Sequence, residues 1–493
     1  MADAGAGSLV QPMRRERAWL LAFVAFAALR VLASAAVFPF FDNVDESAHF
    51  DLVVKWSRLE PPRGLAPFSR ESLREIARWG SPEYLARRDL GGAPLDPSSA
   101  AFAATLEAWG QEPNPESGEP PLYYAIAGLW LALGRGIGLE GVTLLFWLRA
   151  LNALPAAGLV WLGFVTARAV FPESRVQRLG VPLLLAVIPQ DSFWSIGADV
   201  LSPLCFGAAF LGVVRFGTSG PRPHARVAVT GLALAGSVLA KVANAPFVGV
   251  ALVELAARAR RVTRRRPLQT VAPSLALLTV CAALPFAAWL AWNRARFGDW
   301  TGTAAKVARL DWTPKPLTEW LPHPLFTLEG AGHFWSETLA SFWRGEFTWH
   351  LERLAHAPLD AFYWGSSLVL PLVALARLPE SRDSRAALLF AAACFASGLA
   401  FLAALSLAFD FGRCIYPSRT MPFFVSGRLL TGALVPFLLL YVHGLDRVLE
   451  WLTASERARW LALAAIAVAV TVSELLLARA PFASAFNLLH AGG

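Results

Sequence analysis

Charged residues are scarce in this chain of 493 residues. Asp, Glu, Lys and Arg together make up 16% of it, whereas hydrophobic residues make up 56%. The mean hydropathy is +0.47. A soluble globular protein of several domains is far less apolar, so the composition excludes that class and predicts a polytopic membrane protein.

Cysteine is nearly absent as well. The chain has only 4 cysteines, and no two of them form a Cys-x-x-Cys pair. Cys205, Cys281 and Cys394 fall inside apolar runs, and Cys414 stands near the end of one. Neither a disulfide framework nor a cysteine-based zinc site is indicated, so we expect these cysteines to be small core residues.

A continuous basic domain is also missing. The net charge is +8, but the basic residues form short clusters between apolar runs. This distribution argues against nucleic acid as a partner. The expected partner of the positive charge is the cytoplasmic face of the lipid bilayer.

Apolar runs long enough for membrane-spanning helices occur eleven times. They lie near residues 18–38, 142–167, 179–196, 199–214, 227–241, 243–257, 269–292, 360–376, 386–408, 421–442 and 459–478. The first run lacks a small-residue cleavage site, so we expect a retained anchor rather than a signal peptide. A further segment, 119–134, is short and opens with two prolines, which predicts a partly inserted helix that returns to the same side.

The arginines give the orientation of these spans. They gather in every second connection, at 14–17, 168–178, 215–226, 258–266, 377–385 and 447–459. Because short cytoplasmic loops carry the excess of Lys and Arg, this pattern predicts a cytoplasmic N-terminus in the inner (plasma) membrane. The long loops and the polar residues near them are then extracytoplasmic.

Five segments follow from this topology. They are the N-terminal tail and first helix (1–38), an outer catalytic loop with surface helices and the partly inserted helix (39–140), helices two to seven (141–292), a second outer loop (293–358), and helices eight to eleven with a short tail (359–493). Amphipathic pieces at 46–59 and 70–79 predict helices that lie on the membrane surface.

The densest acidic stretch is "PFFDNVDESAHFDL", residues 39–52. In a helix beginning near Asp45, the i to i+4 spacing puts Asp45 and His49 on one face. Three interpretations are open: a carboxylate that does chemistry, N-terminal capping by Asp45 and Glu46, or a divalent-cation site (magnesium or manganese) that includes Asp42. Nothing in the sequence fixes the remaining metal ligands.

Further ionisable residues stand at the same predicted boundary. Asp199, in "VIPQDSFWSIGADVLSPL", is followed by apolar residues and is a functional candidate, whereas loop solvation accounts for Asp191. Arg428 is expected about seven residues inside its span, roughly 10 Å deep at 1.5 Å per residue, where it needs a carboxylate or phosphate partner. Lys241 has snorkelling as an alternative. Acids near cations at a membrane surface suit an anionic, lipid-linked substrate.

Four motifs resemble those of the GT-C fold membrane glycosyltransferases and related uncharacterised bacterial envelope proteins. They are "DNVDESAHF", "GEPPLYYAIAGLW", "WNRARFGDWTG" and "SGRLLTGALVPFLLL", in that order. The resemblance implies an all-α GT-C-like bundle of about eleven transmembrane helices, a partly inserted helix and two long outer loops. It also implies transfer of a sugar from a polyprenyl-(di)phosphate donor to a glycan, lipid or protein acceptor on the outer face.

The motifs and the resemblance give three groups of candidate site residues. The expected catalytic residues are Asp45, Glu46, His49 and Asp199. The residues expected to bind the donor phosphate are Lys241, Arg413, Arg419 and Arg428. The residues expected at the acceptor or in its loops are Asp42, Glu119, Tyr123, Tyr124, Asn293 and Asp299.

Two other functions remain open. Intramembrane charges and many hydrophobic segments also suit a transporter, although no inverted repeat is visible and the polar groups gather at one face. A non-enzymatic envelope scaffold is the third alternative. If the chain is a glycosyltransferase, its short tail after the last predicted helix leaves acceptor choice to the two long loops.

Overall fold

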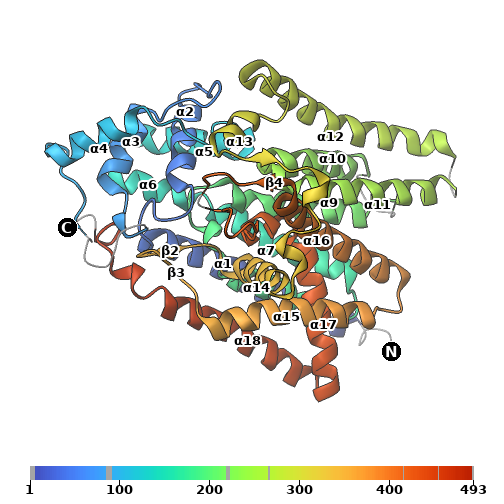
Figure 1. The fold of residues 1–493 in the computed structure, drawn as a ribbon. Helices are drawn as coiled ribbons and strands as arrows, with labels where there is room; N and C mark the ends of the chain where they lie inside the picture. Colours follow the sequence, from blue (N-terminus) through green and yellow to red (C-terminus); the bar gives the residue numbers. More distant parts are fainter. Residues whose placement is uncertain are drawn as a thin grey trace.

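Helices make up most of the computed structural model, which describes residues 6–84, 92–217, 223–264, 267–414, 416–453 and 455–490 (Figure 1). Of the arginines expected on the inner side, Arg222, Arg265 and Arg266 and the side chain of Arg14 lie outside the described residues. The all-α polytopic membrane architecture predicted from the composition is confirmed.

Most helices follow one another with short connections. The exceptions lie in two long polar segments: the first long segment is within residues 39–140, and the second long segment is within residues 293–358. The helices are α1 (Ala6–Val37), α2 (Glu46–Ser57), α3 (Arg70–Trp79), α4 (Ala100–Gly110), α5 (Pro121–Gly136), α6 (Gly141–Ala150), α7 (Ala153–Val170), α8 (Arg175–Val187), α9 (Leu201–Val214), α10 (Pro223–Ala240), α11 (Ala245–Thr263), α12 (Leu268–Phe297), α13 (Ala304–Arg309), α14 (Leu328–Arg344), α15 (Ala357–Ala376), α16 (Arg382–Ala408), α17 (Leu434–Leu452) and α18 (Glu456–Leu477).

Short 3-10 turns and very short strands join these helices. The turns are η1 (Pro82–Tyr84), η3 (Asp191–Phe193), η4 (Ala198–Val200), η5 (Val242–Asn244), η6 (Leu317–Glu319), η7 (Pro324–Phe326), η8 (Gly427–Ala433) and η9 (Pro481–Ala483). The strands are β1 (Thr313–Pro314), antiparallel to β4 (Phe409–Asp410), and β2 (Thr348–Trp349), antiparallel to β3 (Glu352–Arg353).

Eight helical stretches of the described residues are long and apolar enough to cross a membrane. Two more predicted spans correspond to shorter apolar helices, Ala198–Val214 and His224–Ala240. The run predicted at 179–196 is shorter still, because α8 ends at Val187, shortly before Pro189, which cannot continue the helix. The structure therefore contains a helix for each of the eleven predicted spans, but three of them are short.

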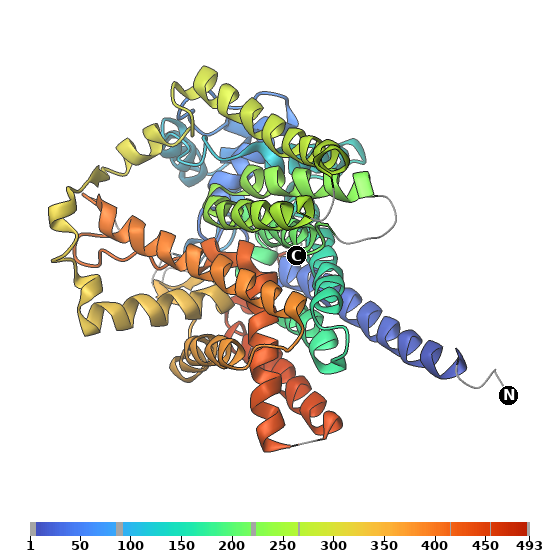
Figure 2. The same cartoon turned by 90° about the vertical axis from the view of Figure 1, so that its right-hand side faces the viewer.

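The last segment of the chain returns to the C-terminal end of α1. The backbone N–H of Phe40 donates to the carbonyl of Phe486, and Leu488 donates to Ala36. Figure 2 shows α1 running outwards from the bundle, with α17 and α18 as a hairpin at another edge. The described C-terminal segment therefore lies against the C-terminal end of α1.

Helix α2 is not a peripheral helix, although its amphipathic sequence predicts one. Residues 48–55 are buried, and α2 packs against α3 and α5. The buried carboxylate of Asp51 forms an ion pair with Lys55 at 2.7 Å and accepts a hydrogen bond from Asn114 at 2.8 Å. These internal partners explain why the polar face of α2 is covered by protein rather than by water.

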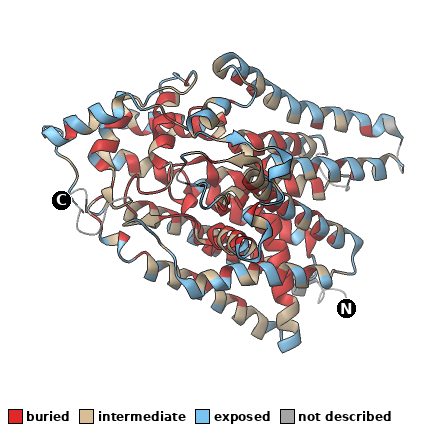
Figure 3. Cartoon of the chain, viewed as in Figure 1, coloured by how far each residue is buried: buried red, intermediate tan, exposed pale blue. Residues whose placement is uncertain are grey.

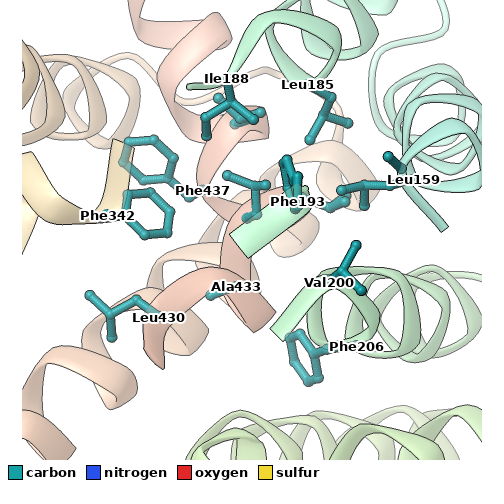
Figure 4. Packing of buried hydrophobic residues seen from close by; sticks show 14 of the residues in the cluster. Leu159, Leu185, Ile188, Phe193, Val200, Phe206, Phe342, Leu430, Ala433 and Phe437 are labelled. Atoms are coloured by element: carbon teal, nitrogen blue, oxygen red, sulfur yellow. The ribbon is translucent and has the colours of Figure 1, made fainter. Parts of the chain in front are cut away.

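The apolar core lies where α7, α8, α9, α14 and α17 meet. Figure 4 shows Leu159, Phe193, Val200, Leu430 and Phe437 converging there, and all five are buried. In Figure 3 buried residues fill the middle of the bundle, while α12 and α18 are largely exposed. Because Val200 and Leu430 are close in sequence to Asp199 and Arg428, this core fixes the backbone that carries both charged residues.

Candidate active site

Charged side chains from distant parts of the chain meet at one end of the bundle. We call them the polar cluster: three cations (Arg428, Lys241 and Lys306) and five carboxylates (Asp45, Asp199, Glu346, Glu116 and Glu119). Both long polar segments contribute, as do the ends of α9, α10 and η8.

Arg428 lies at the centre of the polar cluster. Its Nη2 donates to Oδ2 of Asp45 at 2.7 Å. Its Nη1 is 3.9 Å from Oδ2 of Asp199, and its Nε is 3.5 Å from Oε2 of Glu346. One guanidinium therefore holds three carboxylates from three separate segments, and two of these carboxylates, Asp45 and Asp199, are among the residues that the sequence analysis expects at the site.

Two lysines extend the polar cluster. Nζ of Lys241 is 3.4 Å from Oδ2 of Asp199 and 3.9 Å from Oε2 of Glu119. Nζ of Lys306 donates to both oxygens of Glu116, at 2.7 and 2.8 Å, and is 3.8 Å from Glu119. Lys241 does not snorkel, because its side chain is only 10% exposed and faces these carboxylates.

Asp45 has the position of a helix cap but not the function of one. It is the N-cap residue of α2, yet its side chain makes no capping hydrogen bond. Its backbone has φ +63°, a left-handed conformation that Asp tolerates better than most residues. The carboxylate instead binds Arg428, so the capping interpretation does not describe Asp45.

Arg428 lies at the start of its membrane span rather than a turn or two inside it. The candidate span begins at Gly427, so the expected depth of roughly 10 Å is not observed. The preceding segment is not helical, because hydroxyl groups satisfy its backbone: Ser406 accepts from the N–H of Phe424, and Ser341 accepts from the N–H of Gly427. This non-helical approach brings Arg428 up to the polar cluster.

A break between α10 and α11 positions Lys241. The residue is extended, with φ −154° and ψ 126°, and therefore ends α10. Asn244 ties the break in place: its Nδ2 donates to the carbonyl of Ser237, and its Oδ1 accepts from Oγ of Ser202 on α9. Lys241 is thereby held against the start of α9, next to Asp199.

Glu46 has a different set of partners from its neighbour Asp45. Its carboxylate pairs with Arg149 at 2.8 and 2.7 Å, and both side chains are fully buried. It also accepts from the N–H groups of Phe41 and Ile196, at 3.1 and 2.9 Å. These four hydrogen bonds join the end of α1, the start of α2 and the segment that leads to Asp199.

His49 and the two tyrosines of α5 line the inner side of the polar cluster. Nδ1 of His49 is 2.7 Å from the hydroxyl of Tyr124, while the Tyr123 hydroxyl accepts from the N–H of Gly197. Burial lowers the pKa of His49 to about 4, despite the nearby carboxylates of Glu116 and others. The imidazole is therefore neutral at neutral pH.

Asp191 positions Glu346. Its Oδ2 accepts from the backbone N–H of Glu346 at 2.8 Å. Gly345, at φ +80°, lies directly against this carboxylate, where a Cβ would come within 2.2 Å of it. Burial raises the pKa of Asp191 to about 7, although the N–H of Glu346 opposes the shift.

Burial and charge act differently on the two glutamates of the first long segment. Burial would raise the pKa of Glu116, but Lys306, His49 and Lys241 hold it well below its usual range. Burial raises the pKa of Glu119, and the neighbouring Glu116 adds to the rise against the effect of Lys241. Glu116 is therefore a fixed anion, and Glu119 is the carboxyl that takes up a proton more readily.

Solvent reaches the polar cluster from one edge. The side chains of Asp45 and Lys306 are 34% and 30% exposed, whereas Asp199 is 4% exposed. An apolar cavity of about 270 Å³ lies behind Tyr123, between α5, α7 and α9, with Ile126, Leu154 and Leu204 in its lining. The site is thus exposed to solvent at Asp45 and bordered by an apolar cavity next to Tyr123.

Several predicted site residues lie outside the polar cluster. Arg419 is exposed and pairs with Asp410 at 2.9 Å, and Arg413 is exposed. Asp299 accepts from the N–H groups of Thr301 and Gly302 and so organises its own loop. The remaining two are Asn293, which donates to Trp300, and Asp42, which is fully buried with a pKa raised well above its usual value by burial and by Glu83.

The predicted metal ligands do not assemble. The part of the chain that the structure describes contains no group of three or more His, Cys, Asp or Glu residues that could hold a metal ion. Asp42 and Asp45 have different neighbours, because Asp42 lies beside Glu83 and Asp45 binds Arg428. Among the described residues, Asp42, Asp45 and His49 therefore do not form a divalent-cation site.

Sequence reasoning missed four charged residues of this region. They are Glu116, Lys306, Glu346 and Arg149. Glu116 stands three residues before Glu119, which is the one signal that could have drawn attention to it. Lys306 and Glu346 lie in the second long segment with no motif around them.

Comparison with known proteins gives a family match and several distant structural likenesses, two of which follow. Residues 29–413 match the family described as "Predicted membrane protein (DUF2142)". ArnT from Cupriavidus metallidurans, in a structure with undecaprenyl phosphate, is 13% identical with a TM-score of 0.42, and the match covers 96% of this chain and 75% of ArnT.

The second likeness is to the oligosaccharyltransferase of Archaeoglobus fulgidus, in a complex with zinc and sulfate. It is 14% identical with a TM-score of 0.41; the match covers 93% of this chain but only 53% of the larger protein. No curated protein sequence matches the chain. Both structural likenesses are too distant to assign a role to any residue.

Proposed function

The chain belongs to the DUF2142 family of predicted membrane proteins, and for this member we propose glycosyl transfer from a polyprenyl-(di)phosphate sugar to an extracytoplasmic acceptor. The observation that carries the proposal is the arrangement around Arg428. A central guanidinium holds Asp45, Asp199 and Glu346, and Asp45 faces the solvent-open edge.

The charges of the polar cluster suit both partners of such a reaction. Departure of a phosphate from an anomeric carbon leaves negative charge on the phosphate and positive charge on the sugar. Arg428 and Lys241 would stabilise the leaving phosphate, and the surrounding carboxylates would stabilise the sugar. Asp45 would accept the proton of the attacking hydroxyl, because it is the most exposed carboxylate that contacts Arg428.

The ion pair between Asp45 and Arg428 adds a control step to this scheme. While Asp45 is paired with Arg428, its Oδ2 is occupied by the guanidinium. A donor phosphate that binds Arg428 would replace Asp45 and so free this oxygen for the attacking hydroxyl. Proton removal from the acceptor would then follow donor binding.

Glu46 and His49 take supporting roles in this proposal. The four hydrogen bonds of Glu46 leave it no free position for a substrate, so we assign it to positioning the segment before Asp199. His49 is neutral and would orient Tyr124 or a bound hydroxyl. The apolar cavity behind Tyr123 supports a lipid-linked donor, since it offers hydrocarbon contact beside the phosphate-binding cations.

Transfer can be tested with the purified full-length protein in lipid nanodiscs. We expect radiolabelled sugar to move from one member of a panel of polyprenyl-phosphate hexoses and pentoses to a membrane extract that contains acceptors. Movement of intact donor across a vesicle without product would instead support a transporter. The absence of both from folded protein would favour the scaffold.

We also propose a cytoplasmic N-terminus with the polar cluster outside. Ser98 is exposed and lies in the first long segment. Ser98→Cys, in a background where Cys414 is serine, should react with an impermeant thiol reagent from outside intact cells. Arg457→Cys, exposed in the first turn of α18, is the matched control and should react only after lysis. The reverse pattern of labelling would reject this orientation.

A further inference from the structure

Exposed apolar side chains gather in one part of the second long segment, between α13 and the start of α14. Residues 315–328 read "KPLTEWLPHPLFTL" and include the turns η6 and η7. We call four of these residues the apolar patch: Leu317, Leu321, Phe326 and Leu328, which are between 60% and 94% exposed. Large apolar side chains this exposed and this close together mark a surface that binds a membrane or another molecule.

The exposure of the apolar patch matches that of leucines on the outer surface of the membrane-spanning helices. Leu284 on α12 is 66% exposed, and Leu461 on α18 is 68% exposed. Both helices are long and apolar enough to cross a membrane, so leucines on their outer surface face hydrocarbon. The apolar patch is a surface of the same kind, although it lies outside the candidate spans.

Residues 315–328 lie against the end of one membrane-spanning helix. The N–H of Lys315 donates to the carbonyl of Ala408, the last residue of α16. Strand β1, just before the patch, pairs with β4, just after α16, and turn η7 also contacts α16. In Figure 2 these residues, in yellow, lie at the left edge of the molecule beside the C-terminal end of α16. The apolar patch therefore adjoins the membrane-facing surface of a span.

The backbone that carries the apolar patch is largely paired within itself. Pro322 and Pro324 have no N–H group, and six of the other seven residues from Glu319 to Thr327 donate to local acceptors. The acceptors are the carbonyls of Pro316, Leu317, Trp320, His323 and Pro324, and Nδ1 of His323. Unpaired N–H groups are costly in a bilayer, so a backbone paired in this way suits surroundings with little water.

We propose that residues 315–328 are seated in the lipid bilayer beside α16, with the apolar patch in the hydrocarbon on the side of the polar cluster. Lys315 and Glu319 remain at the level of the headgroups, and Trp320 lies at the boundary, where tryptophan is favoured. A water-soluble partner could also cover apolar side chains. It would have to bind beside the membrane-facing surface of α16, however, where lipid is already present.

This seating also positions two members of the polar cluster, whatever reaction the cluster performs. Lys306 lies on α13, before the apolar patch, and Glu346 lies just after α14, which begins at Leu328. The membrane would fix one end of α14, while the other end brings Glu346 to within 3.5 Å of Arg428. The bilayer would thereby hold the second long segment against the candidate active site.

Photo-crosslinking of the wild-type protein in lipid nanodiscs tests the seating. We expect phosphatidylcholine with a diazirine in the middle of an acyl chain to label residues 315–328 as strongly as α18. Peptides that contain Ser98, which is exposed in the first long segment, should stay at background. Labelling of residues 315–328 at the level of the Ser98 peptides would overturn the proposal and leave the apolar patch to a protein partner.

Thiol reactivity in the same nanodiscs tests individual positions. In a background where Cys414 is serine, Leu321→Cys should react at least tenfold more slowly with a charged thiol reagent than Glu319→Cys, since a charged reagent does not enter hydrocarbon. Both side chains are exposed in the protein, so neither substitution should disturb folding. Equal rates at the two positions would show that both face water, and the proposal would be wrong.

Discussion

Asp45→Asn should lower the rate of sugar transfer by about two to four powers of ten, the usual scale for losing a general base. The substitution keeps the size of the side chain and an oxygen that can accept from Arg428. It removes the charge and the ability to take a proton. Because Asp45 makes no capping hydrogen bond, α2 should form as before.

Donor binding should survive in Asp45→Asn and become somewhat tighter. In the wild-type protein the Asp45 carboxylate competes with the donor phosphate for Arg428. An amide competes less well, because it has no negative charge to attract the guanidinium. Kinetics should therefore show a strongly reduced kcat with an unchanged or lower donor KM.

Two other carboxylates serve as comparisons for Asp45. Glu107 is exposed on α4, and Glu107→Gln should leave transfer unchanged. Glu46→Gln should instead lower the stability of the protein, since it leaves the buried charge of Arg149 without its counter-ion. If folded Asp45→Asn transfers sugar at a near-normal rate, Asp45 is not the base and its role is limited to holding Arg428.

The sequence alone predicted the class of fold and the centre of the candidate site. Apolar runs and arginine clusters reflect the membrane directly, so the spans could be found without tertiary information. The three residues placed at the centre, Asp45, Asp199 and Arg428, all carry charge beside an apolar run. A charge in that position is costly without a partner, which is why it is visible in a sequence.

Other parts of the site could not be predicted, because they depend on tertiary contacts. Lys306 reaches Glu116 across 190 positions of the chain, and Arg149 reaches Glu46 across 103. Arg149 is followed by only one residue of its helix, so it resembles an ordinary charged helix end. Arg419 shows the opposite case. It was expected to bind the donor phosphate because it is basic and near the outer boundary, but in the structure it pairs with Asp410 on the surface.

The start of the span that carries Arg428 shows a further limit. The run 421–442 is continuously apolar enough to predict one helix, but residues 421–426 are not helical in the structure. Their backbone groups bind Ser341 and Ser406, which lie in other helices. Hydropathy measures the side chains and carries no information about such backbone partners.

Arg428→Ala should weaken donor binding as well as slow transfer. Loss of one charge-assisted hydrogen bond to the phosphate should raise the donor KM by roughly 10- to 100-fold. The substitution also removes the cation that faces Asp45, Asp199 and Glu346, so the protein should be less stable. Arg428→Lys keeps the charge without the planar fork and should give an intermediate KM with near-normal stability.

A double variant separates these two effects of Arg428. In Arg428→Ala the carboxylate of Asp45 has lost its partner, and adding Asp45→Asn removes that charge. The double variant should therefore recover part of the lost stability. A double-mutant cycle measures this coupling. It should not recover donor binding, since the phosphate still lacks its guanidinium. Thermal unfolding and donor KM, measured on all four proteins, distinguish the outcomes. An unchanged donor KM in folded Arg428→Ala would show that the phosphate binds elsewhere, and the ion pair with Asp45 would then be purely structural.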